Sequence, residues 1–276
     1  MILGLDLGGT KLLAGCLGDD GTLLETRLWP TGRDLGPAAF VQRLDEVRSW
    51  AGPVRAAGLG FPGLVDAKRG VSRSSVMLDG WSDVPIAALA SAALGAPVWL
   101  ENDVNATALA ELRIRRDAGE RVHDLVLVAL GTGVGGALVL GGRLYTGASG
   151  LAGEIGHVSV DPTGGPLCRC GRRGCLGALA PGAAFGGDEP TVARAVEALG
   201  AGLASVLNVL NPELLVLGGG VINNNEGLVS RLGAAVWTQA MPEIAAACRI
   251  EGARAGAAAG AWGAGLLAIS EAGARP

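Results

Sequence analysis

The chain has 276 residues, of which 49% are hydrophobic, and it carries a net charge of −4 at pH 7. Its basic residues are scattered, which argues against a nucleic-acid partner, because such surfaces concentrate positive charge. Two uncharged stretches need a check for membrane spans: glycines interrupt 125–142, and 255–270 is too short to cross a bilayer. Met1 opens an apolar run without the basic flank of a signal peptide. We therefore expect a cytoplasmic protein with no membrane or nucleic-acid partner.

The N-terminal stretch predicts three antiparallel strands joined by two hairpins. Its apolar runs are Met1–Leu7, Leu12–Leu17 and Leu23–Trp29, separated by a glycine-rich turn and an Asp-Gly turn. The remainder of the first half alternates apolar strands with segments of helical periodicity. In chain order these are a helix from Pro37, a strand at Val54–Leu59 that leads into the turn Gly60–Gly63, a helix at Pro85–Leu94, a strand at Pro97–Leu100 and a helix from Asn102–Asp103.

The second half repeats this opening pattern. Apolar runs at Leu125–Leu130 and Val134–Leu140 flank the tight turn Gly131-Thr132-Gly133, and a further turn leads to a short strand at Arg143–Tyr145. Because the order of strands and turns matches the N-terminus, we interpret it as an internal duplication. This interpretation predicts two similar α/β halves with a cleft between them. The remaining predicted elements are a helix at Val192–Leu210, a strand at Leu214–Leu217 and a helix at Ala257–Ile269.

A glycine hairpin follows the first strand, in the sequence Asp6-Leu7-Gly8-Gly9-Thr10-Lys11. Glycines let backbone N–H groups approach an anion, and the threonine hydroxyl and lysine ammonium add donors to phosphate oxygens. Asp6, at the end of the strand, suits the hydration shell of Mg²⁺. The spacing does not match a P-loop. An ordinary hairpin turn is the alternative, but the second glycine turn at 131–136 favours two loops that bind one polyphosphate.

A polar segment, Glu101-Asn102-Asp103-Val104-Asn105, lies between a predicted strand and a predicted helix. Asn and Asp are preferred helix N-caps, so capping explains part of this composition. Four polar residues among five exceed what a cap requires, and ligands of α/β sheets bind at the carboxyl ends of strands. A carboxylate here can accept the proton of a hydroxyl group during phosphoryl transfer. The segment thus predicts a helix cap or a catalytic base.

One histidine and three cysteines lie close together in the sequence: His157, Cys168, Cys170 and Cys175. This donor set suits a tetrahedral, structural zinc ion with no position left for water. Buried free thiols and a surface histidine are the alternative, but this density of cysteines is rare in a reduced chain. Glu154 lies three residues before the histidine, so zinc would fix the loop that carries its carboxylate.

A fourth motif, Gly218-Gly219-Gly220, follows a predicted strand and permits close approach of a flat ring or ribose. Taken in order, the four motifs resemble the ROK family (repressors, open reading frames and kinases) of the actin-like ATPase superfamily. The His/Cys₃ cluster beside Glu-x-Gly-His is the most specific part of this resemblance. It implies two actin-like (ribonuclease H-like) α/β domains with an interdomain cleft: residues 1–107 plus about 262–276, and residues 108–261.

The resemblance also implies an ATP-dependent hexose kinase, most similar to bacterial glucokinases and homodimeric. Mg²⁺ would accompany ATP, Zn²⁺ would be structural, and Asp103 would be the general base. The other roles follow by position in the motifs. The ATP phosphates would be bound by Asp6, Gly8, Gly9, Thr10, Lys11, Thr132 and Gly133, the adenosine by Gly218, Gly219 and Gly220, the sugar by Gly63, Asn102, Asp103, Glu154 and His157, and zinc by His157, Cys168, Cys170 and Cys175.

Three features depart from the family's pattern. Gly177 stands two residues after the last cluster cysteine, where relatives carry a sugar-contacting Glu. Met77 stands where relatives often carry an Asn that faces the sugar, and the segment 177–200 is shorter than usual. An N-acylmannosamine or N-acetylglucosamine kinase, a polyphosphate-using glucokinase and a non-catalytic sugar-binding relative are therefore alternatives. A repressor of this family would carry an N-terminal helix-turn-helix, for which the sequence before Asp6 has no room.

Overall fold

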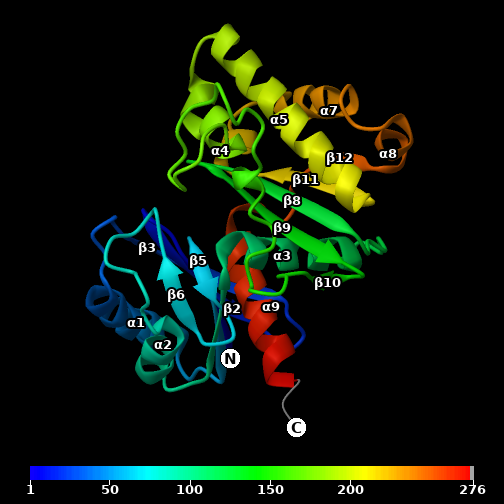
Figure 1. Ribbon diagram of the computed structural model, residues 1–276. Coiled ribbons are helices and arrows are strands. Elements are labelled where there is room, and N and C mark those ends of the chain that lie inside the picture. The colour runs from blue at the N-terminus through cyan, green and yellow to red at the C-terminus, as the bar shows by residue number, and fades with distance from the viewer. Residues whose placement is uncertain (274–276) are drawn as a thin grey trace. The chain divides into compact units, whose positions relative to one another are not determined.

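The computed structural model describes residues 1–273, which form two compact units (Figure 1). Unit 1 comprises Met1–Gly119, Gly147–Leu151 and the described residues from Ala255 onward. Unit 2 comprises Glu120–Thr146 and Ala152–Arg254. Each unit contains one five-stranded sheet and its own apolar core, as expected for an α/β protein built from two halves.

The sheet of unit 1 has the strand order β3-β2-β1-β4-β7. Its first three strands are antiparallel, and β1, β4 and β7 run parallel. Two helices cover one face, where apolar side chains of β1 and β4 join those of α1 and α2, and α9 packs on the other face beside α3. The bounds are β1 Ile2–Leu7, β2 Lys11–Leu17, β3 Leu23–Pro30, α1 Pro37–Ala51, β4 Ala56–Phe61, a small hairpin of β5 Leu64–Asp66 and β6 Val71–Ser74, α2 Ile86–Leu94, β7 Val98–Asn102, α3 Asp103–Asp117, the 3₁₀ turn η3 Gly256–Ala258 and α9 Ala259–Gly273.

The sheet of unit 2 has the equivalent order β10-β9-β8-β11-β12. Again three strands are antiparallel, and β8, β11 and β12 run parallel, which confirms the duplication predicted from the glycine turns. The long helix α5 lies along this sheet with α7 beside it (Figure 1). The bounds are β8 Leu125–Leu130, β9 Val134–Leu140, β10 Arg143–Leu144, η1 Ile155–His157, α4 Leu176–Leu179, η2 Gly182–Gly186, α5 Glu189–Leu210, β11 Leu214–Gly218, α6 Gly220–Asn223, α7 Leu228–Trp237, α8 Pro242–Ala247 and β12 Arg249–Gly252.

Several element bounds differ from the sequence-based expectation for local reasons. Helix α5 begins at Glu189 rather than Val192, because the Asp188 carboxylate accepts the backbone N–H of Thr191 and caps the helix. Strand β4 begins at Ala56 and continues through Phe61, so it extends into the predicted turn. The sequence did not predict the β5–β6 hairpin, α7, α8 or β12, which are short or weakly patterned.

The apolar stretches that raised the question of membrane spans form other structures. Residues 125–142 contain β8 and β9, and residues 255–270 contain η3 and most of α9. Among the described residues, one helix, α5, is long and apolar enough to cross a membrane by length and composition. Half of its most apolar window is buried within unit 2, as is common for a core helix.

Candidate active site

The first glycine hairpin joins β1 to β2 and is held from β3. The Gly8 backbone N–H donates to the Lys11 carbonyl at 2.8 Å and closes the turn. Thr31, directly after β3, donates its hydroxyl to the Gly8 carbonyl at 2.8 Å and its backbone N–H to the Thr10 carbonyl at 3.0 Å. Within residues 1–273 no acceptor takes the backbone N–H of Gly9 or Thr10, which suits donors kept for an anion. No sequence pattern marks Thr31, since a lone threonine after a strand is common.

Asp6 stands at the end of β1, paired in register with Leu13 of β2. Burial raises the pKa of Asp6 from 3.8 to about 6, and the nearby Lys11 ammonium opposes this only in part. No hydrogen-bond partner of its carboxylate is found in the described part of the chain. A partly buried carboxylate without a protein partner fits Mg²⁺ or its water shell, because this ion prefers oxygen ligands.

In the polar segment after β7, Asn102 and Asp103 have different roles at the start of α3. Asn102 is the N-cap of α3: its side-chain oxygen accepts the backbone N–H groups of Val104 at 2.9 Å and Asn105 at 3.1 Å. Asp103 is the first residue of the helix, and its carboxylate also accepts the Val104 N–H, at 3.0 Å. The capping role therefore falls to Asn102, and Asp103 holds a half-buried carboxylate at the positive end of the helix dipole.

Buried Glu101 fixes this segment to the sheet. Its carboxylate accepts the backbone N–H of Asn102 at 2.8 Å and the side-chain amide of Asn105 at 3.0 Å. Burial raises the pKa of Glu101, and the two hydrogen bonds act in the opposite direction. The amide nitrogen of Asn102 donates to the Gly63 carbonyl at 3.2 Å. The structure thus brings Gly63, Asn102 and Asp103 together at the carboxyl ends of β4 and β7.

Met77 lies against the first glycine hairpin. A Cβ added to Gly9 would stand 3.1 Å from the Met77 carbonyl oxygen and 3.6 Å from its terminal methyl group. The Ser75 hydroxyl donates to the Pro62 carbonyl at 2.6 Å and accepts the Met77 N–H at 3.1 Å. This loop is anchored by buried Trp81, whose ring nitrogen donates to a backbone carbonyl at 2.7 Å. A thioether, which is only a weak acceptor, therefore sits beside the hairpin.

The second glycine hairpin, between β8 and β9 in unit 2, is built like the first. The Gly131 N–H donates to the Gly133 carbonyl at 2.9 Å, and in the described part of the chain no acceptor takes the N–H of Thr132 or Gly133. The triple-glycine loop after β11 adjoins it. Gly219 has a φ of 93°, and a Cβ there would lie 2.3 Å from the Leu130 carbonyl oxygen, so only glycine allows this contact.

Glu154 is carried on a turn that lies against β9. A Cβ on Gly153, whose φ is 95°, would lie 2.7 Å from a backbone oxygen of β9, and one on Gly156 would lie 2.1 Å from the Val134 oxygen. Burial raises the pKa of the Glu154 carboxyl, with His157 acting in the opposite direction. Nε2 of His157 stands 3.8 Å from Oε2 of Glu154.

His157, Cys168, Cys170 and Cys175 form one cluster, with their ligand atoms all within 4.8 Å of one another. The Cys168 sulfur is 3.6 Å from Nδ1 of His157, and the sulfurs of Cys170 and Cys175 are 3.6 Å apart. A tetrahedral zinc ion with bonds of about 2.0–2.3 Å requires ligand atoms roughly 3.3–3.8 Å apart. The cluster therefore fits zinc, with Nδ1 as the histidine donor and Nε2 on the side of Glu154.

Gly177, in α4, lies beside the same turn. A Cβ at this position would stand 3.3 Å from the Gly156 oxygen and 3.7 Å from the Val134 nitrogen. A carboxylate at position 177 would thus share the surroundings of Glu154, and glycine supplies no polar group there. The unusual residue falls within the site that the sequence predicted.

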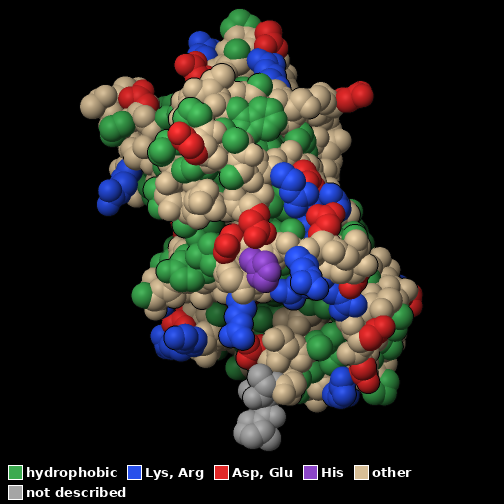
Figure 2. Space-filling model, turned by 90° about the vertical axis from the view of Figure 1, so that its right-hand side faces the viewer, with side chains coloured by type: hydrophobic (Ala, Val, Ile, Leu, Met, Phe, Trp, Pro, Cys, Tyr) green, Lys and Arg blue, Asp and Glu red, His purple; other side chains and the backbone are tan. Residues whose placement is uncertain are grey.

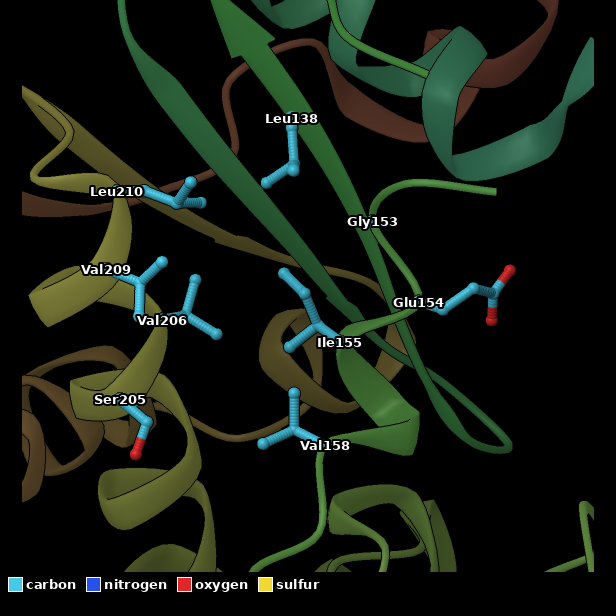
Figure 3. Close-up of a pocket in the computed structure, with 9 residues that line it drawn as sticks. All are labelled: Leu138, Gly153, Glu154, Ile155, Val158, Ser205, Val206, Val209 and Leu210. Carbon is cyan, nitrogen blue, oxygen red and sulfur yellow. The ribbon is translucent and has the colours of Figure 1, made fainter. Parts of the chain in front are cut away.

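A separate apolar hollow lies on the other side of the Glu154 turn, with a volume of about 360 Å³ (Figure 3). Figure 3 shows side chains of Leu138, Ile155 and Val206 lining it, whereas the Glu154 carboxylate points away. Sugar hydroxyls need polar partners, so the hollow does not resemble a hexose site. On the face drawn in Figure 2, Lys and Arg side chains are interspersed with Asp and Glu rather than gathered into a basic patch.

The chain is similar to known proteins in sequence and in fold. The chain is 32% identical to a glucokinase of Thermotoga maritima over 286 positions, covering 88% of this chain and 89% of the relative. It is 36% identical to an N-acetylmannosamine kinase of Citrobacter koseri over 181 positions, covering 65% of this chain and 61% of the relative. A crystal structure of a ROK family glucokinase from Streptomyces griseus, in complex with glucose and AMPPNP, superposes with a TM-score of 0.81 at 28% identity and covers 98% of this chain and 99% of that one.

A sequence model of the ROK family matches residues 2–189 and 186–271. The two matches meet just before α5, within the segment expected to be shorter than usual. Together the two matches span almost every described residue, including both glycine hairpins, the Asp103 segment and the cysteine cluster, and so this chain belongs to the ROK family.

Proposed function

We propose that the chain is an ATP-dependent hexose kinase of the glucokinase type. The observation that carries this proposal is the pair of glycine hairpins, because each has two backbone N–H groups with no acceptor among the described residues. Four such donors suit the phosphate oxygens of ATP. The structure of the glucokinase from Streptomyces griseus contains glucose and AMPPNP, an ATP analogue, which supports glucose and ATP as the substrates of the present chain.

In this proposal the first hairpin binds phosphate through its free N–H groups, the Thr10 hydroxyl and the Lys11 ammonium. The second hairpin binds through Thr132 and Gly133, and the triple-glycine loop beside it borders the adenosine. Mg²⁺ would neutralise charge on the phosphates, and Asp6 would hold it through oxygen ligation. The transition state of phosphoryl transfer is loose, so the rate increases mostly through positioning of the reactants and stabilisation of charge.

Asp103 would act as the general base that receives the hydroxyl proton. Its backbone is fixed by the helix start and its neighbour Asn102 performs the capping, so the Asp103 carboxylate need not serve as the cap. Gly63 and Asn102 would contact the sugar from unit 1, and Glu154 and His157 from unit 2. Zinc, bound by His157 and the three cysteines, would hold the Glu154 turn in place without taking part in the chemistry.

An N-acylmannosamine kinase is the second candidate, because Gly177 and Met77 depart from the family's sugar-contact pattern. Each offers no strong hydrogen-bond acceptor at the predicted sugar side, so hydroxyl contacts that would hold glucose tightly are missing. The 36% identity to an N-acetylmannosamine kinase supports this candidate. Polyphosphate is a further candidate donor, because the hairpins recognise phosphate oxygens rather than the base.

We also propose that the protein works as a homodimer in the cytoplasm. Support for both comes from the resemblance to the family.

A coupled ADP-release assay would test the proposal with glucose, mannose, fructose and the N-acetylated hexosamines. We expect turnover with glucose and ATP. Turnover confined to N-acylated sugars would favour the second candidate, and a parallel assay of sugar phosphate with polyphosphate would test the donor. Absence of phosphorylated product with every sugar and both donors would overturn the kinase proposal and favour a non-catalytic sugar-binding protein.

A further inference from the structure

The first turn of α9 lies directly against the carboxylate of Asp6. A Cβ added to Gly260, the second residue of this helix, would stand 2.6 Å from both Cγ and Oδ2 of Asp6 and 3.0 Å from Oδ1. Real Cβ atoms do not approach other atoms this closely. The carboxylate thus occupies the space that any side chain at position 260 would fill.

Glycines in the strands that pack against α9 have a different structural role. A Cβ on Gly4 would lie 1.8 Å from the Ala261 carbonyl oxygen, and one on Gly58 would lie 1.8 Å from the Ala264 oxygen. At these positions a side chain would meet backbone, which cannot move aside, so the glycines are required for α9 to pack on β1 and β4. At Gly260 the three nearest atoms all belong to the end of one side chain, the Asp6 carboxylate, which can rotate away.

This close packing places the first turn of α9 beside the Asp6 carboxylate. The 3₁₀ turn η3 runs directly into this helix, and the Ala259 N–H donates to the Gly256 carbonyl. Within residues 1–273 no group donates a hydrogen bond to the Asp6 carboxylate, so the packing against Gly260 is a contact that restricts its orientation.

We infer that Gly260 is a positioning residue for Asp6. By having no side chain, it leaves room for the carboxylate against the first turn of α9, and so sets the orientation of the group that the proposed function assigns to Mg²⁺ binding. The inference rests on the proposed function, because that proposal gives Asp6 its role in Mg²⁺ binding. The contact between Gly260 and Asp6 itself does not depend on any bound ion.

The first test replaces Gly260 by alanine and measures the Mg²⁺ dependence of the kinase reaction. We expect the Mg²⁺ concentration for half-maximal rate to rise about tenfold or more, the cost of one misplaced charged contact, with the hexose KM unchanged. The matched control is Gly265→Ala in the same helix, where the three atoms nearest to the new Cβ belong to the Leu17 side chain, the first at 2.4 Å. The control should lower the melting temperature with normal Mg²⁺ dependence. An unchanged Mg²⁺ dependence in Gly260→Ala overturns the inference.

The second test is a double-mutant cycle on thermal stability, which needs neither substrate nor metal. Gly260→Ala should lower the melting temperature of the wild-type chain by a few degrees, and this loss should disappear in an Asp6→Ala background, where the added methyl group has room. Equal losses in both backgrounds would show that Gly260 serves packing alone and would overturn the inference. If the two residues are coupled but Asp6→Ala leaves Mg²⁺ dependence unchanged, the proposed role of Asp6 fails, and the positioning role of Gly260 fails with it.

Discussion

The hairpin between β1 and β2 and the hairpin between β8 and β9 occupy the same place in two sheets of equal topology, but only the first carries charge. In unit 1 the strand before the hairpin contains Asp6, and Lys11 follows the turn. The counterpart of Asp6 in unit 2 is Ala129 of β8, because each residue forms the second strand pair from its turn, Asp6 with Leu13 and Ala129 with Gly135. The two units thus share the shape of the hairpin, and only unit 1 carries the charged groups that we propose for metal and phosphate binding.

The ends of β7 and β12, which occupy equivalent edges of the two sheets, also differ in charge. In unit 1, β7 ends in Asn102 and is followed by Asp103, which opens a helix. In unit 2 the matching strand β12 ends in Gly252 and is followed by Ala253, with no carboxylate at that place. Unit 2 carries its carboxylate on Glu154, after the antiparallel strands, beside the cysteine cluster. The two units therefore share a sheet topology but carry their candidate carboxylates at different places, and each unit can be tested for a separate contribution.

The largest expected effect comes from Asp103→Asn. Removing the base should lower kcat by about 10²–10⁴-fold, because the hydroxyl proton then has no acceptor in the protein. Asn keeps the size of the side chain and can still accept the Val104 N–H, so the melting temperature and the affinity for ATP should not change. A kcat close to that of the wild type would remove Asp103 from the mechanism.

Loss of zinc should act on unit 2 and leave the unit 1 hairpin unaffected. In Cys170→Ser we expect the metal content to fall well below one zinc ion per chain, measured by elemental analysis. The hexose KM should rise roughly 10–100-fold, because Glu154 and His157 lose their support, while the ATP KM should change little. Cys248→Ser, at a buried thiol outside the cluster, is the matched control and should retain zinc. Full activity of zinc-free protein would contradict a structural role for the metal.

The charged hairpin also predicts a pH effect that the uncharged one lacks. The folded-state pKa of Asp6 is raised from 3.8 to about 6, so the folded protein binds this proton more tightly than the unfolded chain. Stability contributed by the protonated carboxyl is present below pH 4 and is lost as the pH rises from about 4 to 6. The thermal stability of Asp6→Asn relative to wild type should therefore increase across this window. Parallel stability profiles of the two proteins would contradict the raised pKa.

The kinase rate should respond to the same group with the opposite sign. If ionised Asp6 is needed for Mg²⁺, activity should fall as the pH drops below about 6 at limiting Mg²⁺, by up to about tenfold per pH unit. High Mg²⁺ should move this decline to lower pH, because the cation favours the ionised carboxyl. In Asp6→Asn the residual activity should not show this Mg²⁺-dependent decline.

Sequence patterns predicted the parts of the site that lie in contiguous motifs. Both glycine turns, the Asp103 segment and the cysteine spacing are visible because few other structures require those residues in that order. Contacts made by residues distant in sequence could not be predicted in this way. Thr31 on the first hairpin and Gly260 on Asp6 each depend on packing of a remote element, and a single threonine or glycine is common in any chain.

The cap at α3 shows a related limit. Asn102 and Asp103 are both good N-cap residues, and the sequence alone left their roles exchangeable. The helix start decided between them, since Asn102 has extended backbone angles and Asp103 is already helical. A helix that began one residue later would exchange the roles of these two side chains. Helix propensity does not determine the first residue of a helix that accurately.

The smallest expected effects compare the two hairpins directly, through Thr10→Val and Thr132→Val. Each threonine is exposed on its turn, and each change removes one hydroxyl from a predicted phosphate contact while keeping the side-chain volume. A hydrogen bond to a charged group contributes about 1.5–3 kcal/mol, so the ATP KM should rise by at least tenfold in each variant, with the hexose KM unchanged. Serine at either position keeps the hydroxyl and should preserve most of the affinity. Additive effects in the double variant would show that the hydroxyls contact different oxygens, as expected for two hairpins that bind one polyphosphate from separate units. An effect confined to Thr10 would instead mean that the duplicated turn in unit 2 kept the shape of a phosphate loop without its use.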